Sequence, residues 1–229
     1  MKIKGITDVF FDLDHTLWDF DKNSGLAFDK IFKLNNLNVD LKLFLEQYEP
    51  INLNYWKLYR EEKIEKEVLR FGRLNDAFLA INMHIEKSVI LKLSEDYITH
   101  LSTFNYLFEN TFEILDYLTL NYNLHIITNG FDEVQHKKMV NSKINTYFKT
   151  VTNSEIVGVK KPNPKIFDYA LQIANTNVEQ SIMIGDNYEA DVLGAINMGM
   201  DAIFFDVNNM LLTDNIKQVD KLIDIKKHL

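Results

Sequence analysis

The chain has 229 residues, of which 46% are hydrophobic and 25% are charged, a balance typical of a soluble globular protein. Its formal net charge of −8 argues against a nucleic acid polymer as partner, and an anionic small substrate would need a local positive site. The absence of cysteine excludes disulfides and thiolate chemistry and favours a reducing compartment.

The first predicted element is a buried strand over residues 7–13, an apolar run that ends around Asp12 and Asp14. This run is too short for the core of a signal peptide, and no later run is long enough to span a membrane. We therefore expect a cytoplasmic protein without membrane contact. The oligomeric state is left open by the sequence.

A long helix-rich segment separates this strand from the next one. Residues 14–124 far exceed the roughly 10–15 residues of an ordinary crossover between parallel strands. Apolar residues recur there at helical spacing, and Pro50 is the only proline of the segment. We predict an all-helical cap domain over residues 18–102, after which residues 110–120 return the chain to the core.

The remainder of the chain alternates short apolar runs with helical patterns. Strands are predicted at 124–128, 150–152, 181–185 and 202–205. Helices are predicted at 131–142, 164–174 and 188–198. This alternation predicts an α/β fold, with a Rossmann-like parallel sheet and right-handed crossovers, formed by residues 1–17 and 103–229.

Three carboxylates follow two of these strands. Asp12 and Asp14 end the first strand, and Asp186 directly follows the strand at 181–185. Ligands bind outside the carboxyl ends of the strands in such sheets, so we expect the three groups to gather there. Clustered carboxylates repel one another unless a cation such as Mg²⁺ compensates them. Taken alone, the Asp12–Asp14 pair also fits a turn in which aspartate caps a helix.

Polar groups also follow the strand at 124–128, where Thr128, Asn129 and Gly130 precede a helix. A hydroxyl group and free amides at a helix N-terminus form a phosphate-binding cradle. The alternative is that Thr128 and Asn129 serve only as helix caps.

Lys161 directly precedes Pro162, whose ring fixes the local backbone direction. A cation at this point can neutralise a phosphoryl oxygen and an attacking carboxylate together. Lys160 competes for this role, and a solvated position is the alternative for either lysine. Asp191, about one helical turn after Asp186, either orients a ligand or the lysine, or is a solvated helix residue.

With these motifs in this order, the chain resembles the haloacid-dehalogenase-like phosphohydrolases over nearly its whole length. The resemblance implies that Asp12 is the nucleophile and that Asp14 is the general acid and base. It implies that Thr128 and Lys161 bind the phosphoryl group. It also implies that Mg²⁺ is held by Asp12, by the backbone carbonyl of Asp14 and by Asp186, and that the insertion is a helical cap.

Four segments resemble more closely the pyrimidine 5′-nucleotidase branch of this family. They are residues 127–131, 157–159, 165–171 and 191–197. This resemblance implies a nucleoside 5′-monophosphate as substrate. Asn129 and Gly130 are candidates for binding this substrate. Trp18 and Phe20 are candidates as well, because they follow the first motif closely in the sequence and aromatic faces stack on flat bases. The alternative for both aromatic residues is a place in the cap's own core.

Several other activities share parts of this pattern. A haloacid dehalogenase needs neither the metal nor the second aspartate, so Asp14 and Asp186 argue against it. A phosphomutase or a sugar-phosphate phosphatase of the same fold shares the motifs and stays an alternative. A non-enzymatic phospho-acceptor module would be about half this length and would lack a cap.

Overall fold

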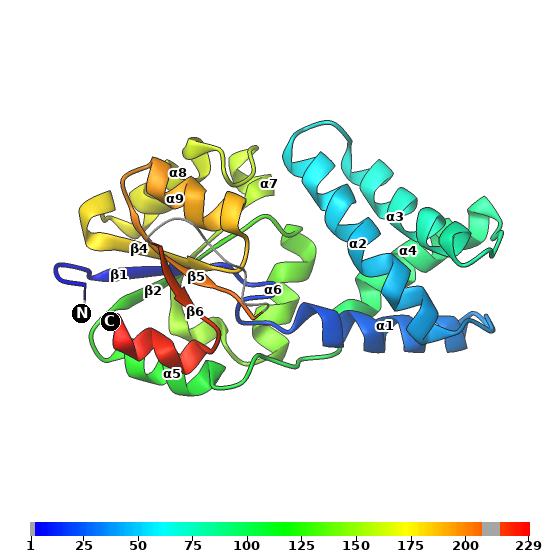
Figure 1. Ribbon diagram of the computed structural model, residues 1–229, viewed down its shortest axis with the longest axis horizontal. Coiled ribbons are helices and arrows are strands. Elements are labelled where there is room, and N and C mark those ends of the chain that lie inside the picture. Colours follow the sequence, from blue (N-terminus) through cyan, green and yellow to red (C-terminus); the bar gives the residue numbers. More distant parts are fainter. Residues whose placement is uncertain (1–2, 208–215) are drawn as a thin grey trace. The chain divides into compact units, whose positions relative to one another are not determined.

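The computed structural model describes residues 3–207 and 216–229 and forms two compact units, each described here by itself (Figure 1). The core unit comprises Met1–Asp19 and Asn105–Leu229, and the helical unit comprises Phe20–Phe104. Each boundary lies two residues beyond the predicted one, which was placed after residue 17 and after residue 102.

The core unit is built on one six-stranded sheet in the order β3-β2-β1-β4-β5-β6, in which every neighbouring pair is parallel. The strands are β1 (Asp8–Phe11), β2 (Asn123–Thr128), β3 (Phe148–Asn153), β4 (Ser181–Gly185), β5 (Asp201–Phe205) and β6 (Lys217–Val219). The strand order reverses between β1 and β4, which is where sheets of this type bind ligands. The predicted Rossmann-like parallel fold is confirmed.

Helices cover both faces of this sheet, with α8 and α9 on one face and α5 on the other (Figure 1). The α-helices are α5 (Thr111–Thr119), α6 (Asp132–Asn141), α7 (Ser154–Val157), α8 (Pro164–Ala174) and α9 (Gly194–Asn197). Three short 3₁₀ helices are η1 (Asn145–Tyr147), η2 (Val178–Gln180) and η4 (Leu222–Lys227). Phe10, Ile127, Phe167 and Met183 are fully buried between the sheet and the α8–α9 layer.

Two features of the core unit differ from the sequence expectation. The predicted helix at 188–198 is divided into a π-helical turn, η3 (Tyr188–Leu193), and the short α9. Strand β6 was not predicted, because its three residues are too few to show an alternating pattern. π-Helical turns occur frequently at functional sites, and η3 follows β4 at the predicted site.

The helical unit contains four helices, α1 (Phe20–Leu34), α2 (Leu41–Arg60), α3 (Lys66–Ala80) and α4 (Lys87–Leu101). Their apolar faces meet in an aromatic cluster, in which the rings of Phe44, Tyr48 and Tyr97 lie 4.5–5.0 Å from that of Phe28. Pro50 lies inside α2 and does not end it. None of the helices in the described part of the chain is long and apolar enough to cross a membrane.

A buried polar network joins the three strands β1, β2 and β3. The side chain of His125 in β2 is 1% exposed, lies 2.8 Å from Thr150 Oγ1 and 3.1 Å from Asp8 Oδ1, and stacks on Phe10. Burial lowers the pKa of His125 below its ordinary value, although Asp8 acts in the opposite direction. The unfolded chain therefore takes up the His125 proton more readily than the folded one.

This network gives the fold a pH-dependent stability. Because the pKa of His125 is lower in the folded state, its contribution is present above the unfolded pKa of about 6.5 and is lost as the pH falls below it. His125→Gln should lower the free energy of unfolding at pH 7.5 by about 1–3 kcal/mol, because buried partners lose hydrogen bonds. Urea unfolding at pH 7.5 and 5.5 should show a smaller pH effect in the variant. Equal pH effects in both proteins would contradict the assignment.

Candidate active site

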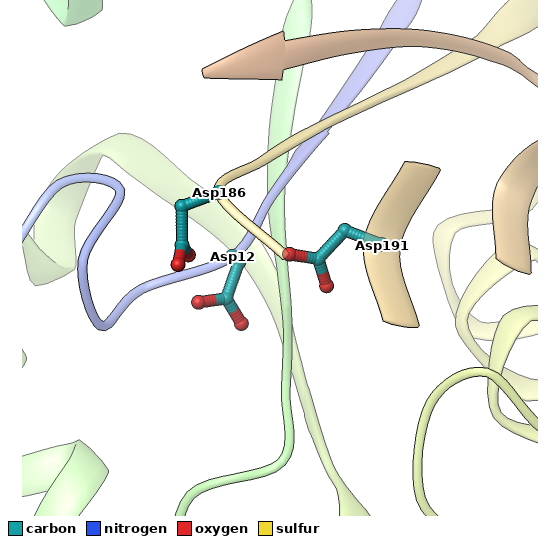
Figure 2. Close-up of side chains that lie close together, drawn as sticks. All are labelled: Asp12, Asp186 and Asp191. Carbon is teal, nitrogen blue, oxygen red and sulfur yellow. The ribbon is translucent and has the colours of Figure 1, made fainter. Parts of the chain in front are cut away.

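Three aspartates converge beyond the carboxyl ends of β1 and β4 (Figure 2). Asp12 follows β1, Asp186 follows β4, and Asp191 comes from η3. Each contributes a carboxylate oxygen to a group in which the three oxygens lie within 4.8 Å of one another. Because β1 and β4 are paired in parallel, Phe11 beside Ile184, residues far apart in the sequence leave the sheet side by side.

Asp191 is drawn into this group by the local backbone. Its side chain is 1% exposed, which excludes the solvated position that the sequence left open. The backbone N–H of Asn187 donates a hydrogen bond to Asp191 Oδ2 at 3.0 Å. Gly185 leaves the necessary space, since a Cβ atom there would collide with the carboxylate of Asp191.

Lys161 lies among these carboxylates. Its Nζ is 2.6 Å from Asp12 Oδ1 and 2.7 Å from Asp191 Oδ1, and it donates a third hydrogen bond to the carbonyl of Ile127. The residue is 1% exposed, whereas Lys160 is half-buried. Burial disfavours the ammonium form, but the two aspartates outweigh this effect and raise the pKa of Lys161 above its usual value. Lys161 therefore stays charged.

Asn129 holds the backbone of Lys161 from both sides. Its side-chain oxygen accepts a hydrogen bond from Lys161 N at 2.7 Å, and its Nδ2 donates one to Lys161 O at 3.0 Å. The sequence suggested Asn129 as a substrate-binding residue. In the structure its amide orients the loop that carries the lysine.

The electrostatics of this cluster suit a divalent cation. Burial, together with the charges of Asp191 and Asp186, raises the pKa of Asp12 well above its usual range. Burial and the neighbouring Asp191 raise the pKa of Asp186 to about 8. One ammonium group thus faces three carboxylates, of which those of Asp12 and Asp191 are buried, and oxygen ligands in such a set fit a cation of the Mg²⁺ type.

Thr16 further orders Asp186. The hydroxyl of Thr16 donates to Asp186 Oδ1 at 3.0 Å and accepts from the backbone N–H of Asp186 at 3.1 Å. The carboxylate therefore has a defined direction. The predicted ligand set included Asp14, and the third side-chain carboxylate found beside Asp12 and Asp186 is Asp191. The predicted contribution of Asp14 concerns its backbone carbonyl and stays a prediction.

The side chain of Asp14 contacts α6 instead. Lys138 Nζ lies 2.6 Å from Asp14 Oδ1, and Gln135 Nε2 donates to Asp14 Oδ2 at 3.0 Å. The sequence analysis missed both partners. A signal was present, since Gln135 and Lys138 share the helical stripe of the buried Phe131, Val134 and Met139.

Thr128 contacts the same helix through Gln135. Its Oγ1 accepts hydrogen bonds from Gln135 Nε2 at 2.7 Å and from the backbone N–H of Gly130 at 3.1 Å. Both lone pairs of the hydroxyl are thereby used, which leaves its proton to be donated to a phosphoryl oxygen. Gly130 provides room for this arrangement, since a Cβ atom there would collide with the Gln135 side chain.

The two aromatic candidates are buried. Trp18 is fully buried in the core unit, and the ammonium of Lys138 lies 4.3 Å from its ring centroid. Phe20 begins α1 of the helical unit and is 7% exposed. Their stacking on a substrate base stays a prediction.

Comparison with known proteins identifies the relatives of this chain. The model of the haloacid dehalogenase-like hydrolase family matches residues 9–205. Pyrimidine 5′-nucleotidase YjjG of Escherichia coli (strain K12) is 33% identical over 193 residues, which are 84% of this chain and 82% of that protein. Glyceraldehyde 3-phosphate phosphatase of Methanothermobacter thermautotrophicus is 33% identical over 226 residues, 93% of this chain and 90% of that protein.

Among solved structures, magnesium-bound YfnB from Bacillus subtilis superposes with a TM-score of 0.87. The match covers 98% of both chains at 24% sequence identity, so it shows that the two chains share a fold.

Proposed function

This chain belongs to the haloacid dehalogenase-like hydrolases, and on that basis we propose that it is a Mg²⁺-dependent phosphomonoester hydrolase with Asp12 as nucleophile. The observation that carries the proposal is the buried cluster in which Lys161 bridges Asp12 and Asp191 beside Asp186. Of the relatives named above, one is a pyrimidine 5′-nucleotidase and one is a glyceraldehyde 3-phosphate phosphatase.

In the first half of the proposed reaction, a carboxylate oxygen of Asp12 attacks phosphorus in line with the leaving group. The bond between phosphorus and the leaving oxygen breaks, and Asp14 gives its proton to that oxygen. An aspartyl-phosphate remains on Asp12. Thr128 donates its hydroxyl proton to a phosphoryl oxygen, and Lys161 stabilises negative charge on the phosphoryl group.

In the second half, water attacks the phosphorus of the aspartyl-phosphate. Asp14, now ionised, takes a proton from that water, and the bond between phosphorus and Asp12 breaks. Inorganic phosphate leaves and the Asp12 carboxylate is restored. Asp14 thus acts as an acid in one step and as a base in the next, so its carboxylate has to stay in one place through both.

Asp12, Asp186 and the backbone carbonyl of Asp14 are the groups proposed to hold Mg²⁺. When bound, the ion neutralises charge on the phosphoryl oxygens and on the attacking carboxylate. The raised pKa values of Asp12 and Asp186 support this assignment, because they indicate that the positive charge near the two carboxylates does not balance their burial and mutual repulsion. Asp191 is proposed to act through Lys161, whose ammonium it contacts.

The helical unit, Phe20–Phe104, is proposed to serve as the cap. Closure of such a domain excludes bulk water during the transfer. A pyrimidine nucleoside 5′-monophosphate is the proposed substrate, on the strength of the 33% identity to a pyrimidine 5′-nucleotidase. Because a glyceraldehyde 3-phosphate phosphatase is equally similar, a small sugar phosphate is the second candidate.

Phosphate release across a panel of phosphomonoesters tests both parts of this proposal. We expect activity with Mg²⁺ and its loss in EDTA, with kcat/KM higher for UMP, dUMP and dTMP than for AMP, triose phosphates or an aryl phosphate. A sugar phosphate preferred by about tenfold over every pyrimidine nucleotide would replace the nucleotidase assignment and keep the phosphatase one. Full activity in EDTA would contradict the proposed dependence on Mg²⁺. A phosphorylated organic product would indicate a phosphomutase.

A further inference from the structure

We propose that Gln135 and Lys138 of α6 are positioning residues, which hold the carboxylate of Asp14 in one orientation through both halves of the reaction. This inference rests on the proposed function, because it concerns the group that would act there as acid and base. It assigns a role to two residues outside the sequence motifs that contain Asp12, Thr128, Lys161 and Asp186.

The two residues engage both oxygens of the Asp14 carboxylate. Lys138 Nζ lies 2.6 Å from Oδ1, and Gln135 Nε2 lies 3.0 Å from Oδ2. One bond alone would leave the carboxylate free to rotate about its Cβ–Cγ bond, whereas two bonds from one helix fix its plane. Residues three apart on a helix lie on the same face, so α6 presents both donors together.

Gln135 also fixes Asp14 relative to Thr128. Its Nε2 donates to Asp14 Oδ2 and to Thr128 Oγ1, at 3.0 and 2.7 Å. Its Oε1 is buried and accepts no hydrogen bond from the residues that the structure describes. The amide orientation follows from its partner, because an ionised carboxylate only accepts hydrogen bonds and of the two amide atoms only the nitrogen donates them. The acid and base group and the proposed phosphate-binding hydroxyl are thereby held at a set separation.

The ammonium group of Lys138 is buried, which carries an energetic cost that an exposed lysine does not have. The residue is 2% exposed, and its ammonium lies against the ring of Trp18 as well as on Asp14. Burying an ammonium is expensive and is offset only where close partners are present. Lys137, the preceding residue of α6, is exposed, so the chain offers a matched lysine on the same helix.

A double-mutant cycle separates this role from a general contribution to the fold. Phosphate release from a nitrophenyl phosphate is suitable, because its leaving group departs without a proton and residual turnover of Asp14→Asn stays measurable. Lys138→Met, which keeps the apolar stem, should lower kcat by about 10–100-fold with little change in KM, and Gln135→Leu by about tenfold. In the Asp14→Asn background, each substitution should cost less than about twofold, because residues that act as a unit are not additive.

Lys137→Met is the control and should leave kcat within about twofold of wild type, as expected for an exposed position. The same loss from Lys138→Met or Gln135→Leu in both backgrounds would overturn the inference while leaving the proposed function intact. Absence of phosphate release by the wild-type protein would overturn the proposed function itself, and this inference with it. If Lys138→Met does not fold, as judged by thermal unfolding, the cycle with Gln135→Leu decides.

Discussion

Replacing Asp12 with asparagine is expected to abolish turnover, with a loss in kcat of about 10⁴-fold or more. The change is nearly isosteric, but an amide oxygen is a poor nucleophile and forms no stable phosphoryl intermediate. Asp12 is the member of the cluster that both contacts Lys161 and directly follows the central strand β1. Phosphate release with the preferred substrate of the panel, at saturating Mg²⁺, measures the loss.

Asp201→Asn is a matched control for this substitution. Asp201 begins β5 and forms a partly exposed ion pair with Lys217, so its removal should change neither activity nor stability by much. Appreciable turnover in Asp12→Asn, beyond what trace wild-type protein supplies, would exclude the nucleophile assignment. Trapping of a phosphorylated protein that persists in the variant would exclude it as well.

Removal of the buried lysine is expected to have the second-largest effect. Lys161→Met should lower kcat by about 10²–10³-fold, because a fixed positive charge is lost from the site where negative charge develops. It should also lower the free energy of unfolding by about 3–5 kcal/mol, since Asp12 and Asp191 lose their shared ion-pair partner in a buried site. Steady-state kinetics and urea unfolding measure the two effects.

Lys160→Met provides the comparison, since the neighbouring lysine is only half-buried. We expect activity near that of wild type in this variant. The reverse pattern, with Lys160→Met inactive and Lys161→Met active, would transfer the role to Lys160. Loss of stability without loss of activity in Lys161→Met would restrict Lys161 to a structural function.

Most of the core fold could be predicted from the sequence, because strand and helix patterns alternate clearly along it. The apolar runs before Asp12, Thr128 and Asp186 predicted three neighbouring strands, and their parallel pairing brings the ends of those strands together. Asp191, which pairs with Lys161, was predicted either to orient a ligand or the lysine or to be solvated. Its burial was not predictable. That burial depends on the π-helical turn η3, whose geometry has no periodic pattern in the sequence.

Helical spacing places Gln135 and Lys138 on the buried stripe of α6, but it does not show which groups they contact. A lysine or glutamine on a helix is solvated in most proteins, and only the tertiary structure shows that Lys138 and Gln135 face Asp14. The same holds for Asn129, whose amide is common at helix starts but here binds the backbone of Lys161. The motifs predict the candidate reacting groups, whereas the contacts that support those groups are seen in the tertiary structure.

The two ends of the helical unit lie close together, so this unit can be replaced by a short linker. Trp18 and Leu107 form a bridge, and Asp19 N donates to Tyr106 O at 3.1 Å, so the two ends of the insertion leave the core unit side by side. A short glycine-rich linker joining Asp19 to Asn105 would therefore span the gap without straining the sheet.

The same path orders events during synthesis on the ribosome. Strand β1 lies at the centre of the sheet but is made first, and its partners β2 and β4 emerge only after the whole helical unit. The helical unit is contiguous in sequence, so all of its residues are made before those of the strands that pair with β1. Once Asp19 pairs with Tyr106, this long loop is closed, and the entropic cost of closing it no longer opposes the pairing of β1 with β2.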